Sequence, residues 1–146
     1  VCRIRGVRQV FVGTAEELLA TSPAQFDAFV LLGNNLGLLR DAEYAPRFFD
    51  LLASIARPGA LIAGTCLDPY RSLDPAHVAY HERNRAIGRM GGQVRMRVRY
   101  RELASPWWEW LFLSLDELER LLHGTLWRIQ DVRESDLTYA VRMQLK

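Results

Sequence analysis

Two histidines four residues apart are the first candidates for chemistry in this sequence. His77 and His81 fall on one face of a predicted helix, with Tyr80 and Asn84 nearby. Two imidazoles at this spacing can ligate a metal ion, but no third ligand is evident, because His123 belongs to another predicted element. We therefore expect no metal site. The same face could line a substrate pocket or form an ordinary helix surface, and the residues leave both interpretations open.

Arginines provide a second candidate, in a run where charged and apolar residues alternate. The charged positions are Arg95, Arg97, Arg99 and Arg101. Guanidinium groups suit phosphates and carboxylates, so this run could bind a small anion or an RNA backbone. The alternative is the solvated face of an edge hairpin whose other face packs inward, with the charges discouraging edge pairing. From the residues alone we favour the solvated face.

A third candidate is the segment Gly33-Asn34-Asn35, which follows an apolar run over residues 26–32. Glycine lets a ligand approach the backbone closely, and an asparagine amide can both donate and accept hydrogen bonds toward an amino-acid group. The same residue types tolerate positive φ and are typical of a plain turn. Without further information, the turn is favoured.

The first half of the chain alternates predicted strands and helices. Strands are predicted over residues 8–12, 26–32 and 60–66. The second is a near-continuous apolar run, as in a strand buried on both faces, and the third is apolar throughout. Thr14 and Glu17 fit a capping box that opens a helix to about residue 20. Helical spacing predicts a second helix over residues 43–56, ended by Arg57-Pro58-Gly59. This alternation predicts an α/β fold with a parallel sheet and helices on both faces.

The second half has a different pattern. Asp74 and Pro75 fit the N-cap and first residue of a helix that continues to about residue 87. Alternating residues then predict an antiparallel hairpin, and a second capping box, Ser114 to Glu117, opens a helix that Gly124 ends. The predicted strands of this half cover residues 94–100, 107–113, 127–134 and 138–145.

Composition limits the class of protein. The chain has 146 residues, of which 49% are hydrophobic and 25% charged, with a net charge of +2. These values are typical of one globular domain and give no electrostatic argument for nucleic acid. The two cysteines, Cys2 and Cys66, form neither a disulfide scaffold nor a zinc motif, which favours a cytoplasmic location. No apolar run is long enough to predict a membrane span or a secretion signal.

Several of these features together resemble the later part of a class I S-adenosylmethionine-dependent methyltransferase. The resemblance rests on the segment FDAFVLLGNN, the RPGALI entry to the next strand, and the final helix followed by two strands. It implies a Rossmann-like methyltransferase sheet in which residues 8–12, 26–32 and 60–66 are the third, fourth and fifth strands. The family's first strand with its Gly-rich loop, and the acid after its second strand, are absent. The resemblance therefore implies a single partial domain over residues 1–146, truncated at its N-terminal side.

The resemblance also assigns positions to a cofactor and a substrate. It implies S-adenosylmethionine as the cofactor, with Thr14 and Ala15 at the adenine and Gly33, Asn34 and Asn35 at the methionine end. Residues 68–113 correspond to the family's variable region, an inserted helix and β-hairpin before the last helix that commonly shapes the substrate pocket. There the expected substrate-binding residues are Tyr80, His81 and Asn84.

The expected function is S-adenosylmethionine-dependent methyl transfer to an unknown acceptor, as part of a longer chain. A small molecule is the favoured acceptor, nucleic acid is less favoured, and no membrane partner is expected. Such transfer depends mostly on alignment of the two reactants, and no residue demands the role of general base. Two alternatives stay open: a non-catalytic remnant of the fold, and an anion- or RNA-binding module that uses the arginine hairpin.

Overall fold

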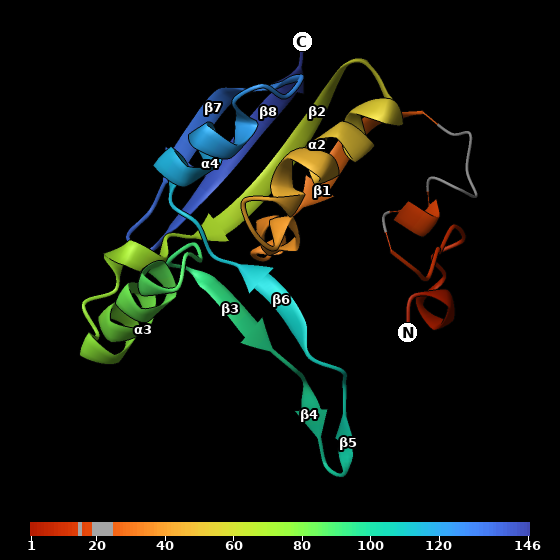
Figure 1. Ribbon diagram of the computed structural model, residues 1–146. Helices are drawn as coiled ribbons and strands as arrows, with labels where there is room; N and C mark the ends of the chain where they lie inside the picture. Colours follow the sequence, from red (N-terminus) through yellow and green to blue (C-terminus); the bar gives the residue numbers. More distant parts are fainter. Residues whose placement is uncertain (15, 19–24) are drawn as a thin grey trace.

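A four-stranded mixed sheet forms the centre of the molecule (Figure 1). The computed structural model describes residues 1–14, 16–18 and 25–146. The strand order is β1-β2-β8-β7, with β1 parallel to β2 and the other two pairings antiparallel. The strands are β1 (Phe26–Leu31), β2 (Ala56–Leu67), β7 (Trp127–Glu134) and β8 (Thr138–Leu145). The α/β class is confirmed, and the last two strands have their predicted limits.

The register of the sheet brings two strand ends together. Leu31 pairs with Gly64, so the carboxyl ends of the parallel strands β1 and β2 lie side by side. Cys66 of β2 pairs with Tyr139 of β8. The segments that follow β1 and β2 therefore leave the sheet at one edge, which is where ligands of open α/β sheets bind.

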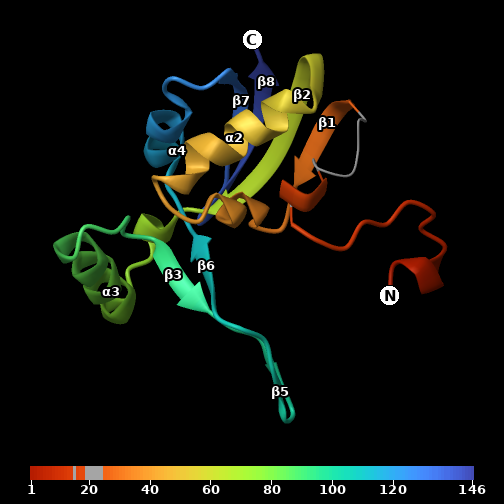
Figure 2. The same ribbon diagram turned by 45° about the vertical axis from the view of Figure 1, so that its right-hand side comes forward.

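Two helices, α2 (Tyr44–Ser54) and α4 (Leu115–Leu122), cover one face of this sheet (Figure 2). The capping box at the start of α4 is confirmed, since the Ser114 hydroxyl accepts the Glu117 N–H at 3.2 Å and the Glu117 carboxylate accepts the Ser114 N–H at 3.1 Å. The indole of Trp127, only 1% exposed, donates to the Phe49 carbonyl at 2.9 Å and fastens β7 to α2.

The other face of the sheet is open in the part of the chain that the structure describes. Val30 on β1 is 65% exposed, and Ala63 on β2 is exposed as well. The prediction that residues 26–32 form a strand buried on both faces is therefore wrong. The strand is only partly buried, and on one side, because α2 and α4 both pack against the same face.

Two further predictions are corrected near the N-terminus and at the start of β2. Residues 8–12 form no strand: although their composition favours β structure, they pair with no other strand among the described residues. Arg57-Pro58-Gly59 does not end a helix but lies inside β2, where Gly59 has φ 76° and the pairing with β1 shifts register. The Thr14 capping box is confirmed by contacts of 2.7 and 3.2 Å with Glu17.

Three short 3-10 turns and one further helix are described outside the sheet and its two covering helices. They are η1 (Arg3–Arg5), η2 (Asn35–Leu39), η3 (Pro69–Arg71) and α3 (Pro75–Ala86). The Asp74 side chain accepts the Ala76 N–H at 2.8 Å, as expected of the N-cap of α3. Residues 16–18 are helical, and Glu16 accepts a hydrogen bond from the Tyr44 hydroxyl of α2. None of the helices described reaches the length and apolarity needed to cross a bilayer.

A two-stranded arm, residues 93–111, projects from the body (Figures 1 and 2). Its paired strands are β3 (Gln93–Met96) with β6 (Trp108–Leu111), and β4 (Arg99–Tyr100) with β5 (Leu103–Ala104). The antiparallel hairpin is thus confirmed. The prediction that one face of the hairpin packs inward is wrong at the tip. There Val98 is 60% and Tyr100 65% exposed, because the arm extends away from the other described residues.

Candidate functional site

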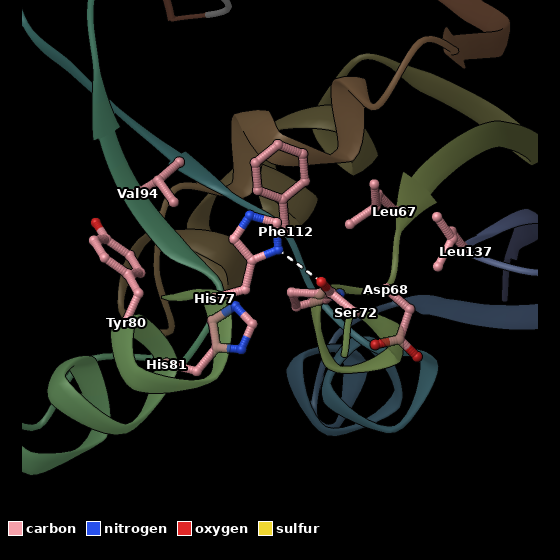
Figure 3. Close-up of a pocket in the computed structure, with 10 residues that line it drawn as sticks. Leu67, Asp68, Ser72, His77, Tyr80, His81, Val94, Phe112 and Leu137 are labelled. Carbon is pink, nitrogen blue, oxygen red and sulfur yellow. Dashed lines mark hydrogen bonds between the residues drawn. The ribbon is translucent and has the colours of Figure 1, made fainter. Parts of the chain in front are cut away.

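A cavity of about 430 Å³ lies at the carboxyl end of β2 (Figure 3). Its size is in the range of small-molecule sites. Side chains from η3, α3, β3 and the turn before β8 surround it. Most of the wall is apolar: Leu67, Pro69, Val94, Phe112 and Leu137. The other lining residues are Asp68, Ser72, His77, Tyr80 and His81.

His77 is held in a defined orientation in this cavity. Its Nδ1 lies 2.7 Å from the Ser72 hydroxyl, which also accepts the Asp74 N–H at 3.4 Å. Figure 3 shows the Nε2 edge of the ring turned away from Ser72, towards Phe112 and Val94. Within the described parts of the chain, Nε2 has no hydrogen-bond partner.

His81 lies one helical turn further along α3 and is packed differently. Its ring meets the Tyr70 ring edge to face, with centroids 5.3 Å apart. Burial lowers the pKa of His81, and the nearby Arg85 and His77 lower it further, so the ring is neutral at pH 7. No group of three or more His, Cys, Asp or Glu side chains that could hold a metal ion occurs among the described residues.

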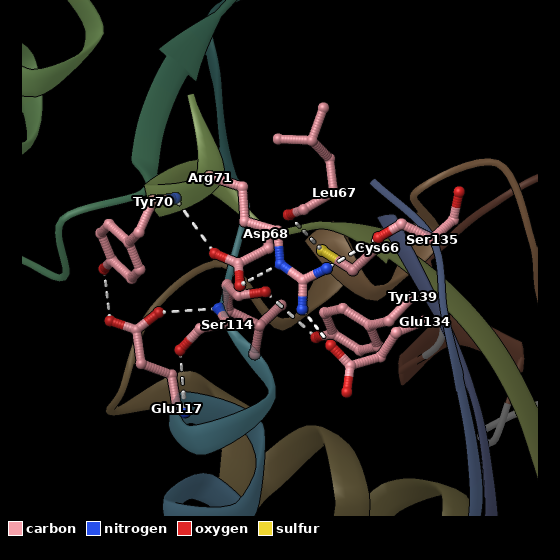
Figure 4. Close-up of polar contacts among 11 residues, drawn as sticks. Cys66, Leu67, Asp68, Tyr70, Arg71, Ser114, Glu117, Glu134, Ser135 and Tyr139 are labelled. Carbon is pink, nitrogen blue, oxygen red and sulfur yellow. Dashed lines mark hydrogen bonds and ion pairs between the residues drawn. The ribbon is translucent and has the colours of Figure 1, made fainter. Parts of the chain in front are cut away.

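Asp68, at the end of β2, is engaged within the protein (Figure 4). The residue is 9% exposed, and its carboxylate accepts the Tyr70 N–H at 3.0 Å and the Arg71 Nε–H at 3.3 Å. Arg71 also donates to the Ser135 carbonyl at 2.7 Å and pairs with Glu134. These contacts fix the floor of the cavity to the β7–β8 turn and leave the Asp68 charge compensated.

A second buried contact joins the cavity region to α4. The Tyr70 hydroxyl donates to Glu117 at 2.5 Å, and burial together with this carboxylate raises the pKa of Tyr70 to about 12. Nearby, burial raises the pKa of the Cys66 thiol to about 11. Tyr139 donates to the Leu113 carbonyl at 3.1 Å, and burial raises its pKa too. All three groups stay protonated at neutral pH, so none is a base there.

The residues expected at the methionine end of a cofactor lie beside this cavity, at the same edge of the sheet. Asn34 adopts φ 66°, and its N–H donates to the Thr65 hydroxyl of β2 at 3.3 Å. Gly33 has φ 71°, and no atom lies within 4 Å of the position that a Cβ would take. Asn35 is exposed at the start of η2. The loop is therefore both a turn of positive φ and an open surface of backbone and amide groups.

The other predicted site residues are placed in three ways. Tyr80 and His81 line the cavity, as expected of residues in a substrate pocket. Asn84 does not: it is 4% exposed, and its Nδ2 donates to the Gly91 carbonyl at 2.9 Å and the Gln93 carbonyl at 2.7 Å. The Thr14 hydroxyl is used in its capping box. Ala15 lies outside the described residues.

The sequence did not indicate several of the residues that line the cavity, among them Asp68, Ser72 and Leu137. Asp68 had a usable signal, because it directly follows an apolar strand at the edge where ligands bind. No sequence pattern indicates Ser72, whose role is evident only from the 2.7 Å between its hydroxyl and Nδ1 of His77. Leu137 arrives from a turn nearly seventy residues later in the chain, and only the pairing of β2 with β8 brings it to the cavity.

No protein-family model and no curated protein matches the chain by sequence. A methyltransferase of Bacteroides fragilis, solved in complex with S-adenosyl-L-homocysteine, superposes over 98% of this chain and 56% of its own, with a TM-score of 0.76 and 19% identity. The fold is that of the S-adenosylmethionine-dependent methyltransferases.

Other proteins with this methyltransferase fold give similar superpositions. One from Clostridium acetobutylicum covers 99% of this chain and 68% of its own, with a TM-score of 0.63 and 11% identity. One from Methanosarcina mazei covers 92% and 66%, with a TM-score of 0.64 and 16% identity. The chain spans little more than half the length of the Bacteroides fragilis methyltransferase. The resemblance to class I methyltransferases, which rested on the segments FDAFVLLGNN and RPGALI and on the final helix with two strands, is thus confirmed as a resemblance of fold.

Proposed function

We propose that this chain takes part in S-adenosylmethionine-dependent methyl transfer to a small-molecule acceptor that binds in the cavity at the end of β2. The proposal rests on one observation, that the expected cofactor loop and the cavity lie at the same edge of the sheet. The open loop Gly33-Asn34-Asn35 and the cavity follow adjacent parallel strands at one edge of a methyltransferase-fold sheet. A cofactor and an acceptor bound there would be neighbours.

The described residues fit the methionine end of such a cofactor. At Gly33 the open space lets a ligand approach the backbone, and the exposed Asn35 amide offers both a donor and an acceptor to an amino-acid group. The Asn34–Thr65 hydrogen bond holds this loop against β2. S-adenosylmethionine, when bound, supplies an electrophilic methyl group on a sulfonium sulfur.

The chain's own contribution to the reaction is alignment. The apolar wall formed by Leu67, Val94 and Phe112 excludes water from an acceptor, and the ion pairs of Asp68 with Arg71 keep the cavity floor in place. Holding two reactants in line accounts for most of the rate gain in a transfer of this type. We propose the same cavity, rather than the arginine arm, as the acceptor site, because the arm offers no enclosed surface.

Calorimetric titration with S-adenosylmethionine tests this function. It compares this chain, a version extended upstream in its reading frame, and Asn35→Ala in whichever version binds. Glu119→Gln, a substitution on the exposed side of α4, is the matched control. We expect saturable binding, weakened about tenfold by Asn35→Ala through the loss of a charge-assisted hydrogen bond, and unaffected by the control. Absence of binding by both folded versions would refute the function and favour a non-catalytic member of the fold.

A further inference from the structure

The cavity combines an apolar wall with an imidazole, His77, that is hydrogen-bonded at one nitrogen and open at the other among the described residues. Nε2 of His77 faces Phe112 and Val94, while Nδ1 contacts Ser72 at 2.7 Å. We propose that the acceptor is a flat, mostly apolar molecule with an ionisable hydroxyl group, of the phenol type, and that His77 Nε2 accepts the hydroxyl proton. This inference deepens the proposed function and rests on it for the methyl-transfer step.

The charge of the cavity favours a hydroxyl over an amine or an acid. A protonated amine would need a free carboxylate, but the Asp68 carboxylate is already paired with Arg71 and with the Tyr70 N–H. A carboxylic acid would need a cation, and no arginine or lysine is among the lining residues. A neutral hydroxyl needs only one hydrogen-bond acceptor, and His77 Nε2 provides it.

Among the polar side chains of the cavity, His77 is the suitable base. Tyr80 carries a phenol, which accepts no proton at neutral pH. His81 is packed against Tyr70, and the positive charge of the neighbouring Arg85 disfavours protonation of the His81 ring. Of the two histidines, His77 has one nitrogen fixed by a hydrogen bond to Ser72 and the other facing the apolar wall.

Ser72 can support both protonation states of His77. Its hydroxyl accepts the Asp74 N–H at 3.4 Å and keeps one lone pair and one hydrogen for His77 Nδ1. When His77 is neutral and Nε2 is free to accept, Nδ1 carries the ring hydrogen and donates it in a hydrogen bond to the Ser72 hydroxyl. When Nε2 has also taken a proton, the Ser72 hydroxyl still accepts the hydrogen bond from the Nδ1–H of the imidazolium. Ser72 is thus a positioning residue that stabilises the imidazolium.

The reaction balances with these groups. As the acceptor oxygen bonds to the methyl carbon, its O–H bond breaks and the proton passes to His77 Nε2. The C–S bond breaks at the same time, and its electron pair stays on sulfur, which becomes a neutral thioether. The imidazolium afterwards releases the proton to water through the open side of the cavity.

The titratable groups around His77 come from two sides of the cavity. Asp68 follows β2 and is paired with Arg71, while Tyr80 and His81 belong to α3. The side chains from β3, the end of β6 and the turn before β8 are apolar. The histidines of the cavity are therefore His77 and His81, and substitution of His77 separates the contribution of one from that of the other.

Binding of 4-nitrophenol tests the inference without any methyl transfer, because its phenolate absorbs visible light and the phenol does not. The wild-type chain is compared with His77→Phe, which keeps a ring but removes both nitrogens, at about pH 6.5, the ordinary pKa of histidine. His123→Phe, the same change at the exposed end of α4, is the matched control. We expect about tenfold weaker binding and a smaller phenolate fraction in His77→Phe alone.

Two more variants separate proton acceptance from packing. His77→Gln offers a neutral acceptor and should restore part of the affinity without restoring the phenolate signal. Ser72→Ala should keep the affinity within about threefold but lower the phenolate fraction, because the imidazolium loses the hydroxyl that accepts its Nδ1–H. Equal binding and equal ionisation in wild type and His77→Phe would overturn the inference, as would failure of the folded wild type to bind 4-nitrophenol.

The two proposals fail in distinguishable ways. His77-dependent binding of 4-nitrophenol without any binding of S-adenosylmethionine would support the acceptor cavity and refute the methyl-transfer function. Binding of S-adenosylmethionine with no dependence of 4-nitrophenol on His77 would support the function and refute the acceptor class.

Discussion

Replacing Asn84 with alanine should destabilise the whole protein rather than only weaken a ligand. The Asn84 amide is 4% exposed and donates to the Gly91 and Gln93 carbonyls at 2.9 and 2.7 Å. These bonds fasten α3 to the base of the arm, so they fix the helix that carries His77 against the cavity.

The size of the effect follows from the two hydrogen bonds. Each buried carbonyl that loses its donor costs about 1–3 kcal/mol, and partial access of water reduces the sum to about 2–4 kcal/mol. With a urea dependence of about 2 kcal/mol per molar, the unfolding midpoint should fall by about 1–2 M. Urea titration followed by tryptophan fluorescence measures this directly.

Asn35→Ala is the matched control, because Asn35 is exposed and has no hydrogen bond of its side chain within the described chain. Its midpoint should stay within about 0.3 M of the wild type, as is usual for surface substitutions. If Asn84→Ala destabilised the protein no more than this control, the structural role assigned to Asn84 would be wrong, and its predicted role in substrate binding would regain support.

Three other substitutions or conditions have defined outcomes. Gly92→Ala should lower the free energy of unfolding by about 1–3 kcal/mol in urea titration, because an added Cβ would overlap the Phe112 carbonyl; an unchanged midpoint would contradict this packing. Iodoacetamide at about pH 8 should alkylate the exposed Cys2 and spare Cys66, whose pKa is raised to about 11 by burial, as mass spectrometry can show. The free energy of unfolding should fall between pH 10 and 12, because the folded protein raises the pKa of Tyr70 from 10.0 to about 12 and so favours its protonated form. Tyr70→Phe should reduce this fall. An equal dependence of the free energy of unfolding on pH in both proteins would count against the assignment.

Local patterns predicted those parts of the fold that short segments determine. The capping boxes at Thr14 and Ser114 form as expected, because each needs only residues three positions apart. The strands β7 and β8 have the predicted limits, since a short turn pairs them directly. Residues 8–12 show the limit of this reasoning, because a β-like composition makes a strand only where a partner strand is available.

The prediction for the start of β2 was wrong for a related reason. Pro58 and Gly59 were interpreted as a helix stop, but the sheet accommodates them in a section that precedes the pairing with β8 and contains a register shift. The candidate site was predicted only where its residues share one helix, as Tyr80 and His81 do. Ser72 and Leu137 join it through long-range geometry that periodicity does not record.

The projecting arm has a mechanical consequence for the cavity. Val94 belongs to β3 and Phe112 directly follows β6, so one end of the arm forms part of the cavity wall. The strand pairing is interrupted at residues 97–98 and 105–107, before the tip formed by β4 and β5. A contact that restrains the paired section of β3 and β6 also restrains the spacing of Val94 and Phe112, so it changes the fit of the acceptor.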